Sequence, residues 1–146
     1  MNTISAIAVA MKEALDPSFQ IYAQQILANA QVMAEEFLSR GYKLVTGGTD
    51  NHMVVVDFSG TDLDGSQAEK TLDKIGISTS KSTIPDDPNP PFRPSGLRIG
   101  MQAMTTRGIK ENETRQIIDF IDRSLRFHDN ETELNKIQAE VTLFCL

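Results

Sequence analysis

The chain has 146 residues, of which 40% are hydrophobic and 23% are charged, values typical of one soluble globular domain with its own core. The formal net charge of −6 argues against a nucleic-acid-binding or anionic-membrane surface, because both need clustered lysine and arginine. The apolar run near the start lacks a basic n-region and is interrupted by Lys12 and Glu13, so it predicts neither a targeting signal nor a membrane helix. The single cysteine, Cys145, fits a reducing compartment, and we expect a cytoplasmic protein.

Two helices are predicted at the start of the chain. Apolar residues at three- and four-residue steps over residues 4–11 predict a short amphipathic helix. Asp16-Pro17 then breaks and restarts the chain, and one apolar stripe runs from Phe19 to Phe37. Asn29 falls largely outside this stripe, and Gly41 supplies the expected stop.

A β-hairpin is predicted next. Residues 42–45 (YKLV) and 52–58 (HMVVVDF) have the composition of strands. They are joined by TGGTDN (46–51), whose glycine, aspartate and asparagine residues tolerate the positive φ of a hairpin connection. This segment lacks the lysine of a phosphate-binding loop and does not match the dinucleotide fingerprint, so we interpret it as a structural turn.

The second half of the chain alternates helices with short strands. Asp64 and Gln67 have the spacing of a capping box, which predicts a helix over residues 64–76. Residues 77–80 (ISTS) and 96–100 (GLRIG) are predicted as strands. The remaining elements are a loop and two helices, over residues 101–110, 111–127 and 131–144.

This order of elements predicts an α/β fold. Short strands with helices on one side favour a two-layer sandwich, with a small, mostly antiparallel sheet covered by helices. The sequence has no internal repeat and no second hydrophobic core. We therefore expect residues 1–146 to form a single domain.

The most informative segment is the proline-rich loop over residues 80–96 and the strand that follows it. Five of the six prolines fall in this loop, which predicts a stiff segment that is neither helix nor strand. In the following strand, Leu97 and Ile99 share one face and Arg98 points to the other. A guanidinium held there suits a carboxylate, to which it can make two parallel charge-assisted bonds. A structural salt bridge is the other interpretation, and the residues alone leave both open.

Other chemistry finds little support in the sequence. His52 and His128 are the only histidines and do not have metal-ligand spacing. The acidic stretch at residues 85–90 is more typical of a solvated turn than of a cation site, so no metal site is predicted. Cys145 has no neighbouring histidine and is not predicted to be a nucleophile.

Four motifs taken together resemble the C-terminal domain of serine hydroxymethyltransferase. They are AVAMKEAL (8–15), GGTDNHMVVVDF (47–58), NPPFRPSGLRIG (89–100) and TTRG (105–108), and they occur in the family's order with matching spacing. The resemblance covers nearly the whole chain. It implies the C-terminal small domain of a fold type I pyridoxal-phosphate enzyme, which converts serine and tetrahydrofolate into glycine and methylenetetrahydrofolate.

The resemblance also implies roles for individual residues. Arg98 matches the family arginine that grips the carboxylate of the amino-acid substrate. Ser82, Pro90, Pro91 and Phe92 match a segment that contacts the folate. Ser82 stands where the family usually has an asparagine, and Pro90 where it usually has a serine.

Further expectations concern what lies outside this chain. In the family a large N-terminal domain holds pyridoxal phosphate and supplies the Schiff-base lysine, and no lysine of this chain lies in a matching motif. We therefore expect the chain alone to be inactive and to bind no pyridoxal phosphate, with that N-terminal domain as its partner in a homo-oligomeric enzyme. The alternative is a free-standing, non-catalytic module that binds an anion or another protein.

Overall fold

Six helices and four strands follow one another in residues 2–146, the part of the chain that the computed structural model describes. In chain order they are α1 (Asn2–Ala14), α2 (Pro17–Ser39), β1 (Lys43–Leu44), β2 (Met53–Asp57), α3 (Gly65–Lys74), β3 (Ser80–Ser82), β4 (Gly96–Gly100), α4 (Gln102–Thr106), α5 (Glu111–Arg126) and α6 (Glu131–Phe144). The order agrees with the sequence prediction except for the added helix α4.

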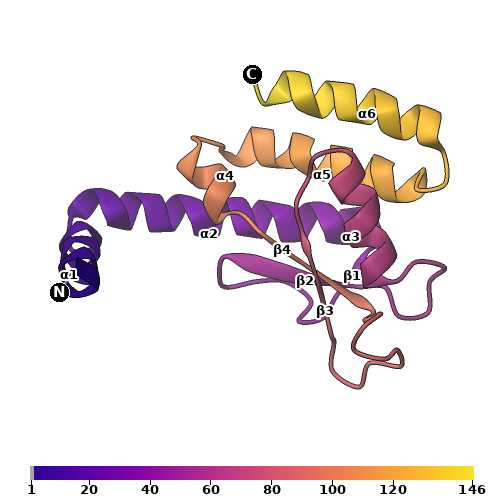
Figure 1. The fold of residues 1–146 in the computed structure, drawn as a ribbon, viewed down its shortest axis with the longest axis horizontal. Helices are drawn as coiled ribbons and strands as arrows, with labels where there is room; N and C mark the ends of the chain where they lie inside the picture. The colour runs from indigo at the N-terminus through magenta and orange to yellow at the C-terminus, as the bar shows by residue number, and fades with distance from the viewer. Residues whose placement is uncertain (1) are drawn as a thin grey trace.

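The four strands form one sheet in the order β1-β2-β4-β3, and every neighbouring pair is antiparallel. The register places Val54 opposite Ile99 and Val56 opposite Leu97, so the buried side chains of the two central strands share one face. The helices α2 and α3 pack on this face, α5 packs on both of them, and α6 packs on α5 (Figure 1). The predicted α/β class with helices on one side of a small sheet is confirmed.

The core lies between the sheet and the helices. Its largest fully buried side chains come from the strands, from the helices on the sheet and from α5 above them, for example Phe37 of α2, Leu72 of α3 and Ile118 of α5. Burying a side chain of this size contributes roughly 1.5–3 kcal/mol. Among residues 2–146, no helix packs on the other face of the sheet, which leaves that face open.

The third strand lies three residues later than predicted, at Ser80–Ser82 rather than at residues 77–80. Gly76 ends α3 with a φ of +84°, and the amide of Ile77 returns to the carbonyl of Leu72. Ile77 packs against the core instead of entering the sheet. The chain reaches β4 only at Ser80, so the position of the strand is determined by its pairing with β4 and not by local composition.

Residues 101–110 contain the short helix α4, where a loop was predicted. The amide of Asn29, predicted on the polar side of α2, is fully buried and donates to Thr105 Oγ at 2.9 Å and to the carbonyl of Ile109 at 2.8 Å. The Thr105 hydroxyl in turn donates to the carbonyl of Met101 at 2.7 Å. This buried polar network fixes α4 against α2.

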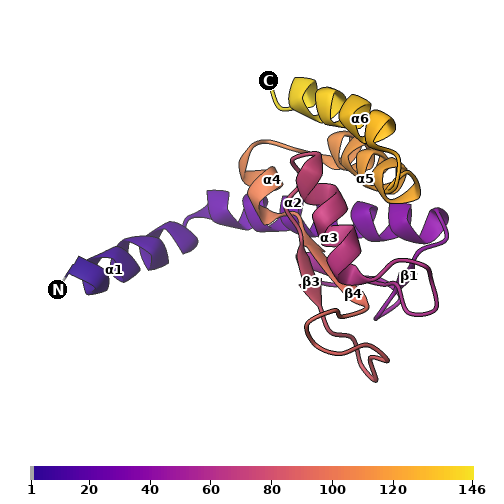
Figure 2. The ribbon, with the colours of Figure 1, turned by 45° about the vertical axis from the view of Figure 1, so that its right-hand side comes forward.

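The first helix forms as predicted but projects away from the rest of the molecule (Figure 2). Every residue of α1 is exposed, and Ile4 and Met11 remain 70% and 61% accessible. The apolar stripe predicted for α2 is likewise exposed at Phe19 and becomes buried only from Ile26 onward. Within residues 2–146, no helix is both long and apolar enough to cross a bilayer.

Candidate functional site

Arg98 lies in the middle of β4, on the sheet face that no helix covers. Its neighbours across the sheet are Val55 of β2 and Ser80 of β3. Leu97 and Ile99 are buried on the opposite face, as the strand alternation predicts. Among residues 2–146, no side chain forms a hydrogen bond or an ion pair with the Arg98 guanidinium, which is therefore available to a ligand.

The loop that leads into β4 is folded around one carboxylate, that of Asp87. Its two oxygens accept hydrogen bonds from the amides of Ile84 (3.3 Å), Asn89 (2.9 Å) and Ser95 (3.0 Å) and from the Ser95 hydroxyl (2.7 Å). Desolvation raises the pKa of Asp87, but these bonds outweigh it and hold the pKa at about 2. The carboxylate thus ties the start of the loop to its end, next to Arg98.

The same loop is fastened to the beginning of α3. The Arg93 guanidinium donates from Nε (3.0 Å) and Nη2 (2.6 Å) to one oxygen of Asp64, whose other oxygen caps α3 at the amide of Gln67. Desolvation raises the pKa of Asp64, and the bonds from Arg93 and Gln67 lower it more strongly. The amide of Gly65 also donates to the carbonyl of Pro94 at 2.8 Å. These contacts make the loop a rigid extension of the helix and the sheet.

The candidate folate residues fall in two places. Ser82 ends β3 opposite Gly96, so it lies on the same sheet face as the free guanidinium, and its hydroxyl donates to the carbonyl of Thr83 at 3.3 Å. Residues 90–92 lie at the exposed end of the loop, where the Phe92 side chain is 72% accessible. The sheet therefore places Ser82 near the free guanidinium, whereas residues 90–92 belong to the loop beyond the sheet.

Sequence reasoning missed the role of Asp87, because the stretch at residues 85–90 was interpreted as a solvated turn. A local signal was present: an aspartate commonly accepts from the amide two residues later, as Asp87 does from Asn89. The bonds to Ser95 span eight residues and have no such signature. Only the folded loop reveals that the carboxylate connects its two ends.

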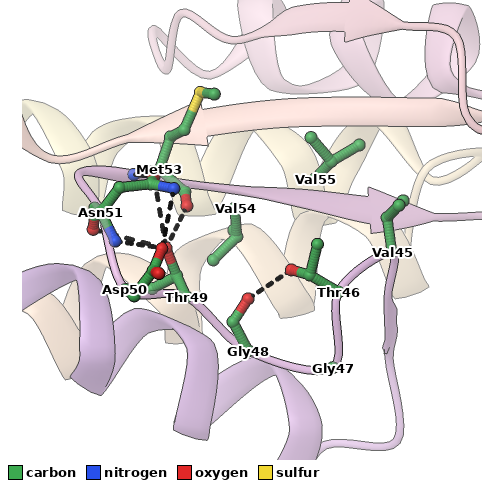
Figure 3. Close-up of a pocket in the computed structure, with 10 residues that line it drawn as sticks. All are labelled: Val45, Thr46, Gly47, Gly48, Thr49, Asp50, Asn51, Met53, Val54 and Val55. Carbon is green, nitrogen blue, oxygen red and sulfur yellow. Dashed lines mark hydrogen bonds between the residues drawn. The ribbon is translucent and has the colours of Figure 1, made fainter.

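A hollow of about 450 Å³ opens beside the connection between β1 and β2 (Figure 3). The polar side chains there are used by the turn itself. The Thr46 hydroxyl donates to the carbonyl of Gly48 at 2.6 Å, and the Thr49 hydroxyl donates to that of Met53 at 2.7 Å and accepts from the amide of Asn51. The prediction that residues 46–51 connect two strands as a turn is confirmed.

Metal-ligating and lysine side chains offer no competing site in residues 2–146. No group of three or more histidine, cysteine, aspartate or glutamate side chains is placed to hold a metal ion in this part of the chain. Every lysine in the same range is exposed, and several form surface ion pairs, such as Lys43 with Asp57 and Lys81 with Glu69. The free guanidinium of Arg98 remains the strongest candidate.

The Asp87 bonds predict how the loop responds to acid. Since the folded-state pKa lies below the ordinary value of about 3.9, the bonds stabilise the loop above pH 4 and are lost as the pH falls from about 4 through 2. The amide NMR signals of Asn89 and Ser95 should therefore titrate with a midpoint near pH 2. Asp87→Asn should shift these signals at neutral pH, whereas Asp86→Asn, at an exposed neighbour, should leave them in place. A wild-type midpoint near pH 4 would contradict the expectation.

Within residues 2–146, fold and site together define a small α/β structure that presents an arginine without a side-chain partner on an open sheet face, beside a loop closed by hydrogen bonds to Asp87. The family model for serine hydroxymethyltransferase matches residues 1–121, and the chain belongs to that family.

Individual relatives agree with this assignment. The chain is 46% identical over 142 residues to the serine hydroxymethyltransferase of Acidobacterium capsulatum. This alignment covers 97% of the chain and 33% of that protein. It is 43% identical over 145 residues to the enzyme of Koribacter versatilis and 45% identical over 145 residues to that of Alkalilimnicola ehrlichii. Each alignment covers 99% of the chain, and 34% and 35% of the relative respectively. The chain thus spans about a third of the length of the curated relatives it matches.

Proposed function

We propose that this chain is the C-terminal small domain of a serine hydroxymethyltransferase and that Arg98 binds the carboxylate of the amino-acid substrate. One observation carries the proposal: Arg98 is exposed on the open face of the sheet and has no carboxylate partner among residues 2–146. A structural salt bridge, the other interpretation of this arginine, needs such a partner. Family membership supplies the substrate class, since serine and glycine both carry a carboxylate.

The proposed role of Arg98 is to orient the substrate. A planar guanidinium makes two parallel N–H···O bonds to a carboxylate and so fixes the direction of the rest of the molecule. Arg98 is held by pairing with strands on both sides, and its neighbours in the chain are anchored in the core. The reaction that we propose for the intact enzyme transfers a one-carbon unit from serine to tetrahydrofolate, giving glycine and methylenetetrahydrofolate.

The folate would contact the loop and the end of β3. We propose Ser82, Pro90, Pro91 and Phe92 for this role, on the resemblance to the family. The exposed Phe92 ring offers a flat apolar surface for a pteridine ring. Ser82 offers one hydroxyl in place of the two donors and one acceptor of the usual asparagine, so we expect fewer hydrogen bonds there.

The residues of this chain do not fit pyridoxal phosphate. A Schiff-base lysine needs a cleft in which its amine is neutral and close to the substrate, and every lysine in residues 2–146 is at the surface. We therefore assign the cofactor to a large N-terminal domain outside this chain, which would also be its partner within a homo-oligomeric, cytoplasmic enzyme. When bound there, the cofactor would serve as the electron sink for the bond that breaks in serine, and this chain would contribute binding and orientation.

This assignment predicts that the chain alone has no activity. Addition of pyridoxal phosphate to the isolated chain should give no absorbance band that responds to glycine, and serine should not be turned over. The full-length polypeptide, measured in parallel, should show both. A stoichiometric, glycine-sensitive band on the isolated chain would refute the assignment of the cofactor to another domain.

A second candidate function is a free-standing module that binds another protein. Such a module would bind through α1, whose apolar side chains project into solvent, including Ile4, Ile7 and Met11. The first function also accounts for this exposure, since the same side chains would pack on the large N-terminal domain. The two functions differ in what precedes the chain in its gene. A coding region upstream that contains a pyridoxal-binding lysine motif supports the first function, and its absence supports the second.

A further inference from the structure

The open sheet face beside Arg98 carries an apolar cluster. Val55 is the direct cross-strand neighbour of Arg98, and Gly96 lies two residues before it on the same face of β4. A Cβ at Gly96 would lie 2.8 Å from Ile84 Cγ2 and 3.2 Å from Val55 Cγ1. The Ile84 and Val55 side chains therefore both lie close to Gly96, two residues along β4 from Arg98.

Ile84 does not belong to a strand, and its position depends on Asp87. One oxygen of Asp87 accepts hydrogen bonds from both the Ile84 amide (3.3 Å) and the Ser95 amide (3.0 Å). Ser95 directly precedes Gly96 and is fully buried. A single carboxylate oxygen thus links the residue that covers the sheet face to the residue that begins β4.

The apolar cluster matters because Arg98 is exposed. Ion pairs in contact with water contribute little to binding, because solvent screens them. An apolar surface on one side of the pair excludes water, lowers the local dielectric and strengthens charge-assisted hydrogen bonds. An arginine on an open sheet face needs such a neighbour to hold a carboxylate well.

We propose that Asp87 is a positioning residue for carboxylate binding, which holds Ile84 against Val55 and Gly96 as an apolar wall beside Arg98. This inference rests on the proposed function of Arg98 and adds a residue to it. Asp87 touches no substrate and acts through the backbone amide of Ile84. Glycine at position 96 permits this close approach, because a Cβ there would lie 2.5 Å from the backbone oxygen of Ser82 and 2.8 Å from Ile84 Cγ2.

The test compares two ligands in the full-length holoenzyme that contains this chain. Glycine has a carboxylate, and glycinamide replaces it with a neutral amide of almost the same size. The ratio of their dissociation constants therefore measures how much the carboxylate charge contributes to binding. Asp87→Asn should weaken glycine binding about tenfold, which corresponds to the loss of one charge-assisted hydrogen bond, and change glycinamide binding less than about twofold. Ile84→Ala should weaken glycine binding selectively by about fivefold, and Ile84→Val should restore most of the loss.

Asp86→Asn is the matched control, because Asp86 is the exposed neighbour of Asp87 and its replacement removes the same charge from the same loop. It should leave both dissociation constants unchanged. Equal weakening of glycine and glycinamide by Asp87→Asn would mean a merely structural role and would overturn the inference. A selective loss for Arg98→Lys without one for Asp87→Asn would overturn this inference alone. If Arg98→Lys shows no selective loss, the proposed function fails and this inference fails with it.

Discussion

Replacing Arg98 with lysine in the full-length enzyme is expected to lower kcat/KM for serine by about 100-fold. The charge is kept, but lysine cannot make two parallel bonds to a carboxylate, because its ammonium is a compact point charge on a flexible stem. The substrate would lose its fixed orientation as well as part of its binding energy. Steady-state kinetics with serine and tetrahydrofolate measure the effect.

The matched control is another exposed arginine on the helical side of the molecule. Arg126 is 59% accessible and pairs with Asp122 within α5, far from the open sheet face. Arg126→Lys should change kcat/KM by less than about twofold, since surface ion pairs contribute little. If Arg98→Lys turned over serine at a near-normal rate, Arg98 would not be the carboxylate-binding residue.

The largest effect on stability is expected at Gly65, the first residue of α3. A Cβ there would lie 2.1 Å from the carbonyl oxygen of Gly96 and 2.9 Å from that of Pro94. Both atoms belong to the backbone, so neither can rotate away as a side chain would. Gly65→Ala must separate α3 from the start of β4, and it should lower the free energy of unfolding by about 3 kcal/mol, as severe overpacking does. Urea denaturation of the isolated chain measures this loss.

Gly48 provides the control for this substitution. It lies in the turn between β1 and β2 without a positive φ, and a Cβ there would have no other atom within 4 Å. Gly48→Ala should therefore change the free energy of unfolding by less than about 0.5 kcal/mol. Equal stability of the Gly65→Ala variant and the wild type would show that the close approach of α3 and β4 is not required.

Sequence reasoning succeeded where the determining interactions are local. Asp64 and Gln67 are three residues apart, and the capping box that they form is present at the start of α3. The alternation of Leu97, Arg98 and Ile99 follows from the geometry of a single strand. The face on which the candidate arginine lies was therefore determined by the sequence, because neighbouring residues in a strand must point to opposite sides.

The tertiary structure decided the contacts that join distant parts of the chain. Asn29 reaches Thr105, 76 residues away, and this pairing turns a polar position of α2 into a buried one. Arg93 bonds Asp64, 29 residues earlier, and fastens the loop to a helix that precedes it. Local sequence patterns do not predict such partners, because the packing of whole helices and strands determines which side chains meet.

Some features of the candidate site are likewise determined by the sequence, and others only by the tertiary structure. The residue type and strand position of Arg98 are properties of the sequence, and so is the stiffness that five prolines give to the loop before it. Within residues 2–146 the guanidinium has no side-chain partner, and the Ile84 amide donates to Asp87. Both features depend on the order β1-β2-β4-β3 and on a sheet whose described helices lie on one side. Strand order and layer arrangement are set by the burial of the whole core, and interactions within a few residues do not specify them.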